Sequence, residues 1–152
     1  MARLRFSQAV DKALAEGMAR DDRIVVLGED VRMLRPGLLA SFGPGRVLGA
    51  PISEAGFVGA GVGAAMAGLR PVIEVWMVDF ITCAMDAVLN HMAKLEAFSG
   101  GRWKCPLVIR TPAAAADTVM EASTGRRSGA CWAASPGWPW SCRQRPPRPT
   151  GS

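Results

Sequence analysis

Two acidic positions have the types and surroundings that could carry proton chemistry. Glu29 and Asp30 directly follow a short β-branched run at 23–27, closed by Gly28. Open α/β sheets place their reactive groups in loops at the carboxyl ends of strands, so two carboxylates there suggest a functional edge. A solvated acidic turn is the alternative interpretation, and spacing alone favours it slightly. Both interpretations stay open at this point.

Glu54 is the second acidic position, and it opens a segment made mostly of glycine and alanine. Ser53 is the expected N-cap of a helix there, so Glu54 would lie in the first turn and interact favourably with the helix dipole. Because the helix is otherwise apolar, a partly desolvated Glu54 would also have a pKa raised toward values useful for acid–base catalysis. The sequence does not decide between these two roles.

Other residues that often carry chemistry give weaker signals. His91, the single histidine, falls in the middle of an expected helix, where a surface or packing role is favoured over catalysis. The glycines of 59–63 lack the spacing and the preceding strand of a dinucleotide fingerprint. No pair of cysteines has the spacing of a zinc site or disulfide framework, so we expect buried or incidental thiols at Cys83, Cys105, Cys131 and Cys142.

Alternating helix and strand signals up to Pro112 predict the elements that position these groups. This alternation is typical of an α/β fold with a parallel sheet covered by helices. The expected strands are 23–27, 46–48, 71–76 and 106–110. The expected helices are 7–18, capped by Ser7, then 38–42, 53–69 and 80–98, the last with Ala84, Val88, Met92 and Leu95 on one stripe.

The helix expected at 53–69 is unusual because interior glycines each destabilise a helix by about 1 kcal/mol relative to alanine. Gly59 and Gly63 lie about one turn apart. Small residues at this spacing would let another backbone approach closely, either the sheet or a helix of a neighbouring subunit.

Composition divides the chain into an expected domain at 1–112 and a different segment at 113–152. The first part holds 13 Lys and Arg against 11 Asp and Glu, whereas the second holds five Arg against two acidic residues. The second part has Val119 as its only branched aliphatic residue, together with three Trp and five Pro, so we expect it to be disordered or loosely collapsed. No membrane span or secretory signal is recognised, which makes the cytoplasm the expected compartment.

Five motifs in register resemble one family over about residues 3–112. The chain is similar to the β subunit of the thiamine-diphosphate-dependent first component of 2-oxoacid dehydrogenase complexes, the pyruvate, branched-chain and acetoin group. The resemblance implies the pyrimidine-binding domain of the transketolase-like fold. The motifs are GEDV at 28–31, FGPGRV at 42–47, PISEAGF at 51–57, GAAMAGLRP at 63–71 and SGG at 99–101.

The resemblance also implies roles for individual residues. Glu54 matches the family glutamate that hydrogen-bonds a ring nitrogen of the cofactor's aminopyrimidine, and Phe80 matches the aromatic that packs on that ring. Glu29 matches an acidic residue near the cofactor, and Gly59 to Gly63 match a helix used in subunit packing between β subunits. The diphosphate and its Mg²⁺ would be held by a partner α subunit in a heterotetramer, and a lipoyl-bearing transacylase would accept the acyl group.

The family pattern is interrupted after Pro112, where a Gln-His pair and a Pro-Gly-Leu-x-Val-Val-x-Pro stretch are expected. Codons read one base out of register permit Leu-Ala-Val-Val-Met-Pro across 137–143, and permit His or Tyr where Ser123 and Thr124 overlap. We therefore hypothesise that residues from about Ala113 are translated out of frame, against the alternative of a genuine divergent tail. The chain would then lack the active-site histidine and would be inactive as truncated.

A non-enzymatic function is the alternative interpretation. Arg143, Arg145 and Arg148 could contact phosphates of a nucleic acid, and 146–149 has the P-x-x-P spacing recognised by Pro-binding domains. The signal is weak because short Arg- and Pro-rich tails are more often simply solvated.

Overall fold

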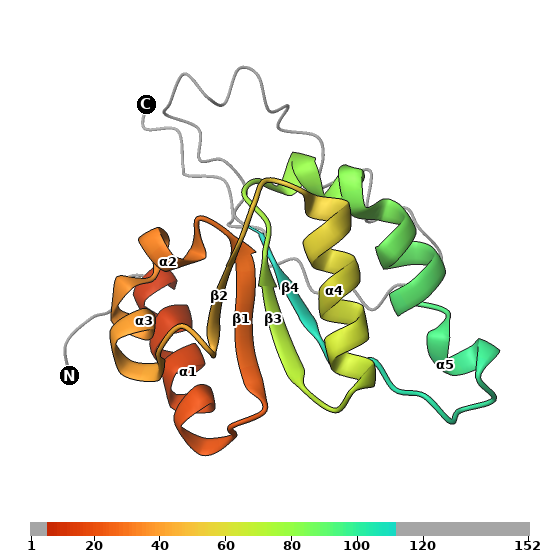
Figure 1. Cartoon of the computed structure of the whole chain (residues 1–152), viewed down its shortest axis with the longest axis horizontal. Coiled ribbons are helices and arrows are strands. Elements are labelled where there is room, and N and C mark those ends of the chain that lie inside the picture. Colours follow the sequence, from red (N-terminus) through yellow and green to blue (C-terminus); the bar gives the residue numbers. More distant parts are fainter. Residues whose placement is uncertain (1–5, 112–152) are drawn as a thin grey trace, which may run out of the picture.

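Four parallel strands form the centre of the molecule (Figure 1). The computed structural model describes residues 6–111, and side-chain burial from residue 8 onward. The strands are β1 (Ile24–Glu29), β2 (Val47–Ala50), β3 (Arg70–Glu74) and β4 (Val108–Arg110), in the spatial order β2-β1-β3-β4. The predicted parallel α/β architecture is confirmed. The segment at 113–152, with Cys131, Cys142 and the arginines considered above, lies outside the described residues.

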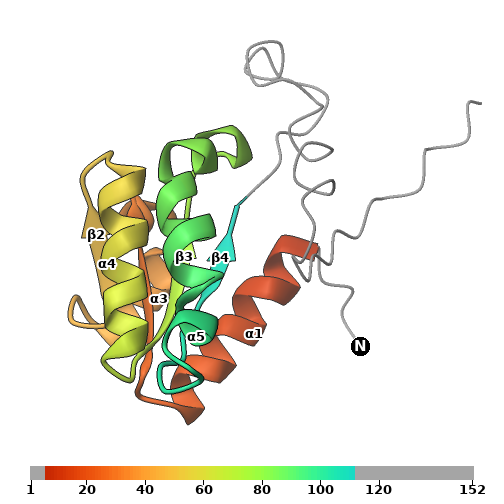
Figure 2. The ribbon, with the colours of Figure 1, turned by 90° about the vertical axis from the view of Figure 1, so that its right-hand side faces the viewer.

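Helices cover both faces of this sheet (Figure 2). On one face α1 (Phe6–Arg20), α2 (Val31–Leu34) and α3 (Pro36–Phe42) enclose an apolar cluster with β1 and β2. On the other face α4 (Glu54–Met66), η1 (Val78–Ala84) and η2 (Ala87–Met92) enclose a second cluster with β3, and α5 (Leu95–Phe98) follows. Alternating strand residues such as Val26 and Leu27 point into opposite clusters, as the period of two requires.

The prediction of a single α-helix at 80–98 is wrong. The chain there forms the 3₁₀ turns of η1, the π-helical η2 and the short α5. Ala84 and Val88 are buried as the stripe predicted, and Met92 packs against the same cluster. These residues recur every four positions, more than the 3.6 residues of an α-helical turn, and the wider π turn keeps such a row facing the core.

The starts of three helices compare differently with the expectations. The first helix begins at Phe6, so Ser7 lies inside its first turn instead of capping it. Ser53 does occupy the N-cap of α4, but its side chain makes no capping hydrogen bond. The short α2 was not predicted, and it forms because buried Val31 turns the chain into the first cluster.

Two glycines permit the close approaches on which the sheet depends. A Cβ on Gly28 would lie 2.2 Å from the carbonyl oxygen of Glu74 on the neighbouring strand. A Cβ on Gly61 would lie 2.3 Å from Cδ1 of Ile73, so α4 packs directly on β3 at this glycine. A Cβ on Gly59 or Gly63 would meet nothing within 4 Å among the described residues, so the sheet is not their partner. Packing of Gly59 and Gly63 against a neighbouring subunit remains a prediction.

No helix among residues 6–111 is long and apolar enough to span a membrane.

Candidate functional site

The carboxyl ends of β1, β2 and β3 meet at one edge of the sheet, the upper end in Figure 1. Glu29 is the last residue of β1, and Glu54 is the first residue of α4, which follows β2 after a short loop. Trp76 comes two residues after the end of β3. Because parallel strands end at the same edge, residues distant in sequence gather here.

Glu29 is the buried carboxylate of this edge. Its side chain is only 5% exposed, and its Oε1 accepts a hydrogen bond of 2.9 Å from the backbone N–H of Trp76. Burial raises the pKa of Glu29 above its ordinary value of 4.5, the Trp76 hydrogen bond partly opposes that rise, and the negative charges of Glu54 and Asp30 add to it. Glu29 is therefore disposed to hold a proton at a pH where an exposed glutamate has lost it.

The two acidic neighbours of the sequence analysis have separate environments. Asp30 is exposed and adopts a left-handed backbone conformation with φ of 50° at the start of α2. The solvated-turn interpretation thus describes Asp30 and not Glu29. The reason is the strand alternation, which points Glu29 toward the α4 face while the chain turns away at Asp30.

Glu54 is half-buried in the first turn of α4. The negative charge of Glu54 contributes to the raised pKa of Glu29, so the two carboxylates interact electrostatically. The partial burial expected for Glu54 is confirmed. The negative charge of Glu54 makes ionisation of Glu29 less favourable, because like charges repel.

Phe80 lies in η1, which packs against α4 near the same edge (Figure 1). Its side chain is 42% exposed, although Val78 and Ile81 of the same element are buried. The 3₁₀ geometry explains this, since three residues per turn leave one face of η1 outward. An exposed aromatic ring beside the acidic edge offers a flat apolar surface to a ligand.

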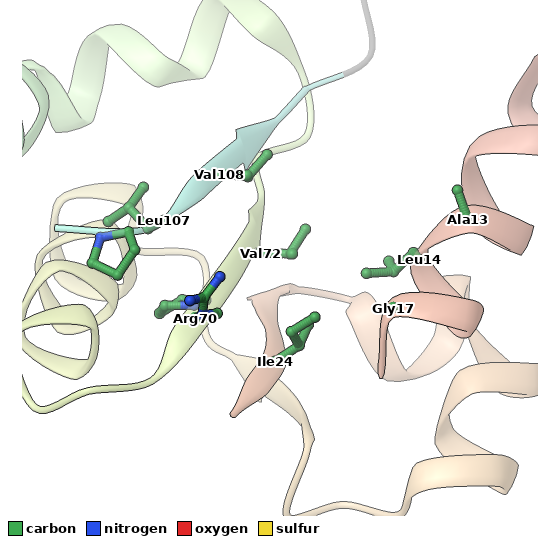
Figure 3. Close-up of a pocket in the computed structure, with 10 residues that line it drawn as sticks. Ala13, Leu14, Gly17, Ile24, Arg70, Val72, Leu107 and Val108 are labelled. Carbon is green, nitrogen blue, oxygen red and sulfur yellow. The ribbon is translucent and has the colours of Figure 1, made fainter. Parts of the chain in front are cut away.

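Two surface hollows lie away from these residues. One of about 400 Å³ is apolar and lies between α1 and strands β1, β3 and β4 (Figure 3). The other, of about 320 Å³, lies between α1 and α3. Glu29, Glu54 and Phe80 line neither hollow. The acidic edge is therefore distinguished by its chemistry and not by the size of a cavity.

Trp76 is the contributor to this edge that sequence reasoning missed. It acts through its backbone N–H, a group that almost every residue carries, so its identity gave no signal. The only usable hint was Gly28, because a glycine at the end of a buried strand indicates a close approach by a neighbouring backbone.

The remaining candidates lie apart from the edge or on the surface. His91 is exposed on η2, with Nε2 3.8 Å from Oδ2 of Asp86, which agrees with the predicted surface role. Cys83 is exposed, Cys105 is half-buried, and burial raises the pKa of the Cys105 thiol. Within residues 6–111, no three His, Cys, Asp or Glu side chains are grouped in a way that could hold a metal ion.

Comparisons with known proteins agree with this arrangement. The chain is 43% identical over 136 residues to the "Pyruvate dehydrogenase E1 component subunit beta" of Rickettsia bellii (strain RML369-C), covering 86% of this chain and 42% of that relative. It is 38% identical over 118 residues to the "2-oxoisovalerate dehydrogenase subunit beta" of Bacillus subtilis (strain 168), covering 74% of this chain and 36% of that relative. The chain thus spans about two fifths of the length of these curated relatives.

A solved structure titled "Split gene transketolase, inactive beta4 tetramer" has the same fold, with a TM-score of 0.57 and 22% identity. The similarity covers 69% of this chain and 33% of that one. The family described as "Transketolase, pyrimidine binding domain" matches residues 2–140, which extends past Pro112 into the second segment. From this match over most of its length, the chain belongs to the transketolase pyrimidine-binding domain family.

Proposed function

We propose that this chain forms the pyrimidine-binding half of a thiamine-diphosphate site, as part of the β subunit of a 2-oxoacid dehydrogenase. The observation that carries the proposal is the acidic edge, where buried Glu29 has a raised pKa and shares its surroundings with half-buried Glu54. The names of the curated relatives, a pyruvate and a 2-oxoisovalerate dehydrogenase β subunit, supply the reaction class.

The donor set of this edge fits an aminopyrimidine ring. Glu54, half-buried in the first turn of α4, would place its carboxylate against a ring nitrogen and share a hydrogen bond with it. When bound, thiamine diphosphate supplies the nucleophilic carbon required to decarboxylate a 2-oxo acid. Phe80 would cover one face of the ring and exclude water from it.

Glu29 would act next to Glu54 and not on the ring. Its burial favours the protonated form, which removes a negative charge from the neighbourhood of Glu54. The Trp76 N–H keeps Oε1 of Glu29 in a fixed position.

The residues described here do not fit the diphosphate or its Mg²⁺. No cluster of metal-ligating side chains is present in the described range. We therefore assign the diphosphate and Mg²⁺ to a partner α subunit, and the acyl group to a lipoyl-bearing transacylase. Gly59 and Gly63 of α4 would pack against a second β copy, since a Cβ at either position would meet no atom of the described part of the chain within 4 Å.

Cofactor binding tests the proposal directly. Isothermal titration with thiamine diphosphate and Mg²⁺, using this chain with a cognate α subunit, should give binding heat that depends on Glu54. Losing one charged hydrogen bond is worth about 1.5–3 kcal/mol, so Glu54→Ala should weaken affinity roughly 10- to 150-fold. Glu16→Ala, on exposed helix α1, is the matched control and should leave affinity unchanged. Equal affinity for all three proteins would refute the role of Glu54.

A further inference from the structure

A closed ring of four charged side chains lies on the α1 face of the sheet, behind the acidic edge. Glu74, only 1% exposed, accepts hydrogen bonds from Nε of Arg35 at 3.0 and 3.1 Å and from Nη1 of Arg110 at 3.2 Å. Asp11 closes the ring, since its Oδ1 accepts from Nη2 of Arg110 at 2.7 Å and its Oδ2 from Nη1 of Arg35 at 3.4 Å.

The ring ties together four separate elements. Asp11 comes from α1, Arg35 from the junction of α2 and α3, Glu74 from the end of β3 and Arg110 from the end of β4. Two positive and two negative charges balance, so the group as a whole can be buried without a net charge. Each carboxylate bridges both guanidinium groups, which fixes the lateral positions of all four elements at this end of the sheet.

The backbone from Glu74 to Trp76 connects the ring of four charged side chains to the acidic edge on the other face of the sheet. The carbonyl oxygen of Glu74 lies so close to Gly28 that no Cβ could fit between them, and Glu29 is the next residue of β1. Two residues beyond Glu74, the N–H of Trp76 donates to Oε1 of Glu29. Between them the N–H of Val75 donates to the carbonyl of Arg110, which holds β3 to β4.

We propose that Glu74, held by Arg35 and Arg110, is a positioning residue for Glu29. The ring fixes the end of β3 from behind, and this fixes the direction of the Trp76 N–H that holds the Glu29 carboxylate in place. Its importance for cofactor binding rests on the proposed function. The geometric link itself does not, because it lies entirely within this chain.

Amide hydrogen exchange on the chain alone tests the link. In the charge-balanced double variant Glu74→Gln with Arg110→Gln, Arg35 and Asp11 remain paired, so no buried charge is left without a partner. The Trp76 amide should then exchange about tenfold faster or more, relative to the Val26 amide, which is bonded to the Arg46 carbonyl on the far side of the sheet. An equal acceleration of both amides would mean that the ring serves only global stability, and would overturn the proposal.

A milder variant keeps the test decisive if the double variant does not fold. Asp11 is the outer, partly exposed member of the ring, so Asp11→Asn loosens the ring without removing Glu74. The matched control is Asp22→Asn, which removes a fully exposed acidic partner of the mostly buried Arg46. Selective acceleration of the Trp76 amide in Asp11→Asn, and not in Asp22→Asn, supports the positioning role. Identical exchange in both variants contradicts it.

Discussion

The backbone N–H of Trp76 donates a hydrogen bond of 2.9 Å to Oε1 of Glu29, which joins the segment after β3 to the last residue of β1. The two residues are 47 positions apart in the chain. The contact forms because β1 and β3 are parallel neighbours whose carboxyl ends coincide, and because Gly28 lets β3 approach without a side chain in between. It fixes one buried carboxylate oxygen beside the half-buried Glu54.

The raised pKa of Glu29 should make the stability of the chain fall as pH rises. The stabilising contribution of Glu29 is complete below its unfolded pKa, near 4.5, and is lost as pH rises through the higher folded pKa. Glu29→Gln is neutral at every pH and can still accept the Trp76 hydrogen bond. In urea unfolding, the variant should therefore gain stability relative to the parent as pH increases from about 4.5.

Glu16→Gln, on the exposed face of α1, is the control for that series. The stability difference between parent and control should show no comparable rise with pH. If the Glu29→Gln curve ran parallel to the parent curve from pH 4 to 8, burial would not be raising the pKa of Glu29.

Gly28→Ala should destabilise the chain by about 1–3 kcal/mol, the usual cost of overpacking. The new Cβ would meet the Glu74 carbonyl oxygen at 2.2 Å, and a backbone atom in the middle of a sheet cannot move aside cheaply. Gly37→Ala in α3 is the control because its Cβ would meet nothing within 4 Å. Urea unfolding should show a loss for Gly28→Ala and no loss for Gly37→Ala; equal stabilities would contradict the close approach.

A substitution at Gly63 should change the assembly of the chain without lowering its stability. Gly63 is exposed, and a Cβ there would meet nothing within 4 Å in residues 6–111, so Gly63→Leu should keep or improve the stability of α4. If α4 packs against a second β copy through its small residues, the same leucine should shift the complex with the α subunit toward smaller assemblies in sedimentation velocity. Unchanged assembly would place the β contact elsewhere.

The reading frame after Pro112 is testable at the level of the gene. A nucleotide sequence across codons 108–125 should reveal a one-base displacement near codon 113 relative to the family pattern. The shifted frame should encode a Gln-His pair at codons 122–124. An intact frame with no such match in the shifted codons would identify the segment from Ala113 as a genuine divergent tail.

Much of the architecture could be predicted from local patterns. Short β-branched runs separated by amphipathic or glycine-rich segments predicted all four strands, each within two residues of the observed bounds at either end. Of the stripe Ala84, Val88, Met92 and Leu95, the first three contact the core cluster as predicted, and Leu95 is not part of it. The kind of helix was not predicted, because over two turns a spacing of four residues fits an α-helix almost as well as a wider π turn.

The sequence by itself determined the strand runs, the glycine-rich helix and the presence of Glu29 and Glu54 at the ends of elements, because these depend on residue type and local period. Only the tertiary structure decided that Glu29 is buried and Asp30 exposed, that Gly61 and not Gly59 or Gly63 faces the sheet, and that Trp76 holds Glu29. Those outcomes depend on which strands are neighbours, and therefore on contacts between residues far apart in the chain. Burial and partner charges, which set the pKa of a carboxylate, exist only once these neighbours are in place.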